Sequence, residues 1–209
     1  MRRGLNKIDL SAITFSTAFL LLSAACCRGE DSSQTGTNTN AVAPSTVCSP
    51  KDSGREENNF LAGVRGGFSL FDGNLKFQQA EVYGQWKTPW RWNFCSDYSV
   101  RVCVDGSGGW LHSYSVSSTI WTLGPVLEFR KGKFPIILEG GISPTLMNKH
   151  NFGGNNFGSN FQLTSHIGVQ WEITRRLTVG LRIQHMSNAG LANPNPGLNM
   201  QMFSASYTF

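Results

Sequence analysis

The chain has 209 residues, a formal net charge of +5, only 15% charged residues and 23 glycines. This composition is too apolar and too rich in glycine for a disordered chain or for a nucleic-acid-binding protein. Part of the positive charge lies at the extreme N-terminus, so the rest of the chain is less basic than the total suggests. The length suits one domain together with a targeting segment.

Residues 1–25 have the pattern of a secretory signal peptide. A basic start is followed by an apolar core from Ala12 to Leu22 and by the small residues Ser23-Ala24-Ala25. The apolar core is shorter than the roughly 20 residues that cross a bilayer as a helix. Because Ser23 stands where a lipoprotein signal has leucine, we expect simple cleavage, with lipidation of Cys26 or Cys27 as the alternative. The remaining chain is therefore expected to leave the cytoplasm.

Residues 26–58 are rich in Ser, Thr, Asn, Gly and Asp and show no apolar period, which predicts a disordered linker. Of the five cysteines, Cys95 and Cys103 are close enough in sequence to pair in an oxidising compartment. The cysteines and histidines show no metal-ligand spacing. We therefore expect neither a metal nor a cofactor.

From Asn59 to Phe209 the dominant pattern is an alternation of period two, which is typical of β-strands. It is clearest at the seventh predicted strand, where Leu177, Val179, Leu181 and Ile183 share one face. The predicted strands, in chain order, are Phe60–Ser69, Phe77–Lys87, Tyr98–Val104 with an irregular continuation, Ile120–Arg130, Phe134–Leu146, Phe161–Ile173, Leu177–Ser187 and Leu198–Phe209.

A soluble β-sandwich also alternates, but charged residues lie deep in these strands. They share the polar faces and are Arg65, Glu81, Arg101, Glu128, Glu139, Glu172 and Arg182. A sandwich core cannot hold such charges, whereas a barrel interior can pair charges of both signs. The lengths of the connections also favour a membrane barrel, which has short turns at one end and long loops at the other. Tight turns at Arg130–Lys133 and Thr174–Arg176 contrast with the long loop Asn148–Gly158. So small a barrel has a filled interior, which argues against a porin.

The last predicted strand places Phe203, Tyr207 and the terminal Phe209 on one face. This pattern resembles the C-terminal strand through which the barrel-assembly machinery recognises outer-membrane proteins. We therefore predict an all-β fold, an eight-stranded antiparallel transmembrane β-barrel of the bacterial outer membrane, over residues 59–209. With both ends on the periplasmic side, the seventh strand ends outside, at His185–Asn188.

A candidate catalytic group lies on the last hairpin. His185 and Ser187 are two residues apart on a strand, so both side chains point to the lipid face. An imidazole can take the seryl proton and activate the hydroxyl as a nucleophile. Counting back from Phe203 places Gln201 and Asn199 on the same face of the last strand, so we expect Asn199 to orient His185, with Gln201 as the alternative.

The intervening loop offers donors for an oxyanion. Asn188 and Asn195 carry side-chain amides, and backbone N–H groups lie near Gly190. Each of these residues alone is more often structural, since asparagine and glycine are ordinary turn residues. Their occurrence together with His185 and Ser187 on one face favours the functional interpretation.

The His-x-Ser-Asn run, the Asn-Ala-Gly and Pro-Asn-Pro-Gly loop and the aromatic C-terminal strand resemble the PagL family of lipid A 3-O-deacylases. The resemblance implies an eight-stranded outer-membrane barrel that hydrolyses the ester at the 3-position of lipid A without a metal. It implies catalytic roles for His185 and Ser187, and oxyanion roles for Asn188 and Asn195. The sequence departs from the family at Asn199, where the best-known members carry glutamate.

Two function classes therefore remain. The first is a serine-type carboxylic ester hydrolase that acts on the lipid A of lipopolysaccharide in the outer leaflet. The second is a non-catalytic small outer-membrane barrel with a structural or surface-interaction role. A phospholipase-type esterase with the same site is a weaker third alternative, and a homodimer is left open. No nucleic acid is expected as a partner.

Overall fold

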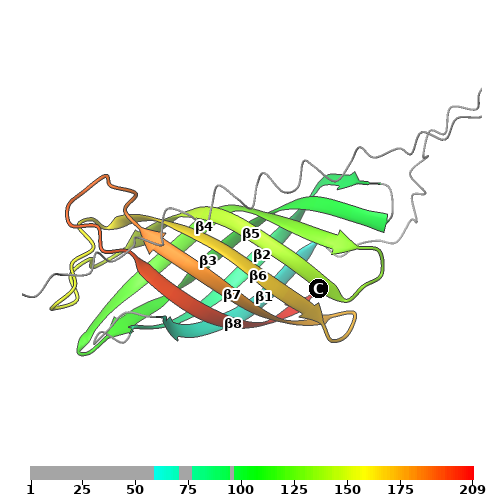
Figure 1. The fold of residues 1–209 in the computed structure, drawn as a ribbon. Helices are drawn as coiled ribbons and strands as arrows, with labels where there is room; N and C mark the ends of the chain where they lie inside the picture. Colours follow the sequence, from blue (N-terminus) through cyan, green and yellow to red (C-terminus); the bar gives the residue numbers. More distant parts are fainter. Residues whose placement is uncertain (1–58, 71–76, 95–96) are drawn as a thin grey trace, which may run out of the picture. The chain divides into compact units, whose positions relative to one another are not determined.

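A computed structural model of the chain describes residues 59–70, 77–94 and 97–209 (Figure 1). The predicted signal peptide and linker, and with them Cys26, Cys27 and Cys95, lie outside the described residues. Cys103 is described and buried. None of the described segments is a helix long and apolar enough to cross a membrane.

Eight strands form one closed antiparallel barrel in which each strand pairs with its neighbours in the chain and β1 pairs with β8. This confirms the predicted fold class. The strands are β1 (Phe60–Ser69), β2 (Phe77–Asn93), β3 (Tyr98–Ser113), β4 (Val116–Lys131), β5 (Ile136–Met147), β6 (Phe161–Glu172), β7 (Leu177–Ser187) and β8 (Leu198–Thr208).

Strands β1 and β7 have the predicted bounds, whereas β2, β3 and β4 are longer than predicted. The run Asp105–Gly109 has the composition of a loop, yet it lies inside β3. Neighbouring strands explain its glycines. A Cβ on Gly108 would meet the Trp121 ring at 2.5 Å, and one on Gly109 would meet the Ala80 carbonyl oxygen at 2.1 Å. These glycines therefore allow close packing between strands, which a turn signal in the sequence does not reveal.

The two ends of the barrel differ (Figure 1). At one end, here called the loop end, lie the long connections 148–160 and 188–197 together with the two-residue connection 114–115. At the other end, here called the turn end, lie the short connections 132–135 and 173–176 and the C-terminal Phe209. Phe209 N donates to Phe60 O over 3.1 Å, so the last residue helps to close the barrel.

The interior is filled in two layers. Beneath the loop end lies an apolar cluster formed by Phe77, Leu111, Ile120, Met147, Phe152, Phe157, Met186, Leu198, Met200 and Met202. Further toward the turn end, Arg65 donates to both oxygens of Asp105 over 2.9 Å and also pairs with Glu81. A cavity of about 10 Å³ beside Asp105, His166 and Arg182 has room for about one water molecule. The interior is thus packed, as expected for so narrow a barrel.

Candidate active site

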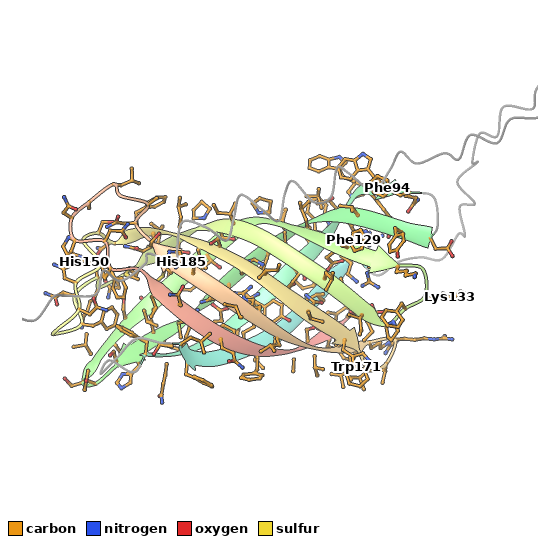
Figure 2. All side chains as sticks on the ribbon, viewed as in Figure 1. Phe94, Phe129, Lys133, His150, Trp171 and His185 are labelled. Atoms are coloured by element: carbon orange, nitrogen blue, oxygen red, sulfur yellow. The ribbon has the colours of Figure 1, made fainter. Side chains whose placement is uncertain are left out.

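The β7–β8 hairpin joins His185 to Asn199. The two residues are direct cross-strand partners, and the His185 Nδ1 and Asn199 Oδ1 atoms are 2.8 Å apart. Figure 2 shows His185 nearer the end of the barrel that carries His150, while Lys133 and Trp171 lie at the opposite end. Gln201, the predicted alternative, is paired with Ile183 instead. The pairing of Asn199 with His185 follows directly from the strand register.

This contact favours one tautomer of the neutral ring. An amide oxygen only accepts hydrogen bonds, so Asn199 Oδ1 requires the hydrogen of the neutral imidazole to be on Nδ1. His185 Nε2 then carries the lone pair and is able to act as a base. The site has no carboxylate at this position, so a positive charge on the ring is stabilised only by the dipole of the amide.

Ser187 lies two residues after His185 on the same face of β7 and is half-buried. Its backbone pairs with Leu163 of β6. Its hydroxyl makes no hydrogen bond to any residue that the structure describes, His185 included. Catalytic hydrogen bonds are often long before substrate binds, so this separation is compatible with a nucleophile and base that approach each other on the substrate.

Asn188 has a different environment from the one predicted. Its side chain is fully buried, and Nδ2 donates to the carbonyl oxygens of Phe157 and Ala192 over 2.9 Å and of Pro194 over 3.1 Å. Since each of these acceptors is a backbone group of a loop, the amide joins the 148–160 and 188–197 connections. It is therefore directed away from the lipid face and is not available to an oxyanion in this arrangement.

The other two predicted donors differ from each other. Gly190 N donates to Asn188 Oδ1 over 2.9 Å, so this backbone group is already used. Asn195 is exposed, and its Oδ1 accepts from Asn188 N over 3.1 Å. Because the oxygen is held in this way, the Asn195 Nδ2 group is oriented by the loop and has no acceptor among the described residues. Of the three predicted donors, Asn195 is the one that the fold leaves free.

Two glycines that the sequence did not single out shape the site. Gly158 has φ +78°, and a Cβ there would meet Pro194 O at 2.3 Å and Asn188 Nδ2 at 2.8 Å. Gly197 has φ +68°, and a Cβ there would lie 2.9 Å from His185 Cε1. Gly158 thus lets the two loops pack together, and Gly197 lies against the imidazole edge between the two ring nitrogens. The positive φ of each is the conformation that glycine adopts without strain.

No group of three or more His, Cys, Asp or Glu side chains within the described ranges is arranged to hold a metal ion. On the lipid face the His185 imidazole contacts the Asn199 amide, Ser187 lies two residues from His185 on the same face of β7, and Asn195 lies in the connection between the two strands. This is a set suited to nucleophilic chemistry with a histidine base.

Comparison with known proteins shows the family of this chain. Residues 78–208, more than half of the chain, match the family model for lipid A 3-O-deacylase (PagL). The chain belongs to this family. The lipid A deacylase PagL of Bordetella bronchiseptica is 28% identical over 152 residues, which are 70% of this chain and 85% of that protein. The lipid A deacylase PagL of Pseudomonas aeruginosa is 33% identical over 73 residues, 35% of this chain and 42% of that protein.

The crystal structure of the outer membrane enzyme PagL superposes with a TM-score of 0.60 at 20% identity, over 70% of this chain and 97% of that chain. At this identity the match supports the fold. Together with the closed barrel and membership of the PagL family, it makes the chain an outer-membrane β-barrel protein.

Proposed function

We propose that this PagL-family chain is a lipid A 3-O-deacylase, with Ser187 as nucleophile and His185 as base. The observation that carries the proposal is the 2.8 Å contact between His185 Nδ1 and Asn199 Oδ1 on the lipid face, with Ser187 two residues further along the same strand. An oriented imidazole and a hydroxyl on the same face of one strand support a hydrolase over a non-catalytic barrel.

The proposed reaction has two stages: Ser187 first takes up the acyl group, and water then releases it. His185 Nε2 takes the Ser187 proton while Oγ attacks the carbonyl carbon of the ester at the 3-position. The Asn195 amide donates to the oxyanion that forms. The intermediate collapses when the sugar oxygen leaves with the proton from Nε2, which yields the acyl-serine. Water then gives a proton to Nε2 and attacks the acyl group, and the returning proton restores Ser187 as the fatty acid leaves.

The location suits a lipid that stays in the membrane. With the loop end outside, His185 and Ser187 lie at the outer rim of the lipid-facing surface, the depth of the acyl esters in the outer leaflet. The ester then meets the site by lateral diffusion, without extraction of the lipid.

The test is the mass of the product. The full chain, refolded in detergent, is incubated with lipopolysaccharide, and the lipid A is analysed by mass spectrometry. We expect loss of one ester-linked hydroxyacyl chain, and no loss with Ser187→Ala. A lipid A that lacks the 3-linked chain is the control for position and should remain unchanged. Phospholipids assayed in parallel test the phospholipase alternative.

Two outcomes contradict the proposal. If the Bordetella bronchiseptica relative removes the chain under the same conditions and this protein does not, the protein is not a deacylase. If Ser187→Ala retains activity, the nucleophile is misassigned.

A further inference from the structure

The lipid face of the barrel has a groove of about 510 Å³ on the β8, β1, β2 and β3 strands, to one side of the candidate active site. One cross-strand row runs across it. Phe203 pairs with Gly66, Gly66 with Ala80, and Ala80 with Trp110. The row thus places two small residues between two aromatic side chains, across about 14 Å at the usual strand spacing. The small residues are the floor of the groove and the aromatic residues are its walls.

The barrel itself does not require the glycine in this floor. A Cβ on Gly66 would meet nothing nearer than Gln79 O, at 3.7 Å, which is ordinary contact. On the same strand, a Cβ on Gly63 would meet Ala205 O at 2.3 Å, and one on Gly67 would meet Gln201 O at 1.9 Å. Gly63 and Gly67 are therefore explained by close packing between strands. Glycine weakens a strand, and close packing between strands does not explain Gly66. A glycine of this kind is typical of a position that another molecule approaches.

The next row toward the loop end has three polar residues and one aromatic residue, Phe68. Gln201 pairs with Phe68, Phe68 with Gln78, and Gln78 with His112. His112 Nδ1 is held 2.8 Å from Ser117 Oγ. Amide and imidazole groups therefore border the outer end of the groove, and apolar side chains border its depth. This is the polarity of a site for a lipid whose chain lies along the barrel and whose head group lies at the rim.

The groove and the candidate active site share strand β8. Asn199, Gln201 and Phe203 alternate on its lipid face, so four residues, or about 13 Å, separate the partner of His185 from the wall of the groove. A phospholipid carries its chains on one glycerol, whereas the chains of lipid A hang from two linked sugars. A ligand that reaches the groove and the active site at once needs the wider spacing between chains that the two sugars of lipid A provide.

We propose that this groove binds a second acyl chain, one that is not cleaved, of the lipid A molecule whose ester lies at Ser187. The inference rests on the proposed function for the identity of the lipid. It assigns to Gly66, Ala80 and Trp110 a role in substrate selection. In a bilayer the chain exchanges lipid contacts for protein contacts, so only packing distinguishes the two and the effect on affinity is moderate.

The first experiment fills the floor. Gly66→Leu and Ala80→Leu are assayed on lipid A with its full set of chains and on a monosaccharide that carries only the scissile acyl ester. We expect the ratio of kcat/KM for the two substrates to fall about threefold to tenfold in each variant, mainly through KM. Matched controls are Val64→Leu and Val82→Leu, which lie on the same strands and the same face one row nearer the turn end. An unchanged ratio in both groove variants overturns the proposal.

The second experiment does not depend on turnover. Each groove substitution is combined with Ser187→Ala, and bound lipid A and phosphatidylethanolamine are measured by native mass spectrometry. We expect weaker retention of lipid A and unchanged retention of phosphatidylethanolamine; an equal loss of both overturns the proposal. If the native protein removes no acyl chain but the groove variants still lose lipid A selectively, the deacylase function fails and the groove stands. Gly66→Ala, a smaller change, covers the case in which Gly66→Leu does not fold.

Discussion

In the barrel interior, Arg65 donates three hydrogen bonds to Glu81 and Asp105, whereas Ser187 on the lipid face makes none with any described residue. The interior group is buried, charged and paired. The group on the hairpin lies on the lipid face and is only partly bonded, since Asn199 holds one nitrogen of His185 and leaves the other free. The comparison separates two uses of polar groups in one barrel: groups that satisfy one another stabilise the fold, and the proposed chemistry uses groups that keep a free donor or acceptor.

The largest effect is expected at Ser187, where activity and stability should respond differently to the same substitution. Ser187→Ala should reduce deacylation by at least about 10³-fold, because the nucleophile is removed. The same change should leave the unfolding midpoint in urea unchanged, since the hydroxyl contacts no described partner. Lipid A mass spectrometry and the shift of the folded band on a gel measure the two quantities. A clear loss of stability would show that Ser187 has a structural partner.

Arg65 is the opposite case. Arg65→Ala leaves the buried carboxylates of Glu81 and Asp105 without their main partner, so it should lower the free energy of unfolding by about 3–5 kcal/mol. Activity per folded molecule should stay the same, because the interior cluster does not reach the lipid face. The control Arg65→Met/Asp105→Asn removes the charge of Asp105 together with that of Arg65 and leaves Glu81 paired with Arg182, so it should recover part of the stability. If this double variant is no more stable than Arg65→Ala, unpaired charge is not the cause of the loss.

Gly197 links the conformation of the 188–197 connection to the His185 ring. A methyl group on Gly197 must displace the His185 ring or the loop, and we expect Gly197→Ala to reduce kcat about 10²-fold. Gly153→Ala is the matched control, because Gly153 also has a positive φ, of +71°, but a Cβ there meets nothing within 4 Å. Both variants then share the backbone strain, whereas only Gly197→Ala brings a methyl group against the His185 ring. Equal losses of activity in the two would remove the proposed role of Gly197.

Asn199 carries the smallest expected change. Because Asn199 Oδ1 already selects the useful tautomer of His185, glutamate should add only the charge that stabilises the imidazolium, and Asn199→Glu should raise kcat roughly tenfold. Asn199→Leu removes the acceptor and should reduce kcat instead. Initial rates on lipid A measure both. A large loss with Asn199→Glu would show that Asn199 does not orient the base.

Much of the site was accessible from the sequence because strands alternate with period two. Parity alone placed His185 and Ser187 on the lipid face, and parity counted back from Phe203 placed Asn199 there too. The structure confirms these faces, and the cross-strand pairing of His185 with Asn199 selects Asn199 over Gln201. The bounds of β1 and β7 were predicted for the same reason, since both strands are short and regularly patterned.

The loop residues were not predictable in this way. Asn188 and Asn195 have the same side chain seven residues apart, yet one is fully buried against three carbonyl groups and the other is exposed. Which amide faces the substrate depends on how the 148–160 connection packs on the hairpin. That contact joins segments about thirty residues apart, and no local pattern encodes it.

Sequence period therefore determined the fold class, the faces of the strands and the placement of His185 and Ser187 on one face, because each of these depends on neighbours in the same strand. Only the tertiary structure decided which loop amide is free, why Gly197 lies beside His185 and how Phe203, Gly66, Ala80 and Trp110 come to form one row. These depend on register between strands and on contacts between loops. Both are set by packing across the barrel, in which residues distant in the chain become neighbours.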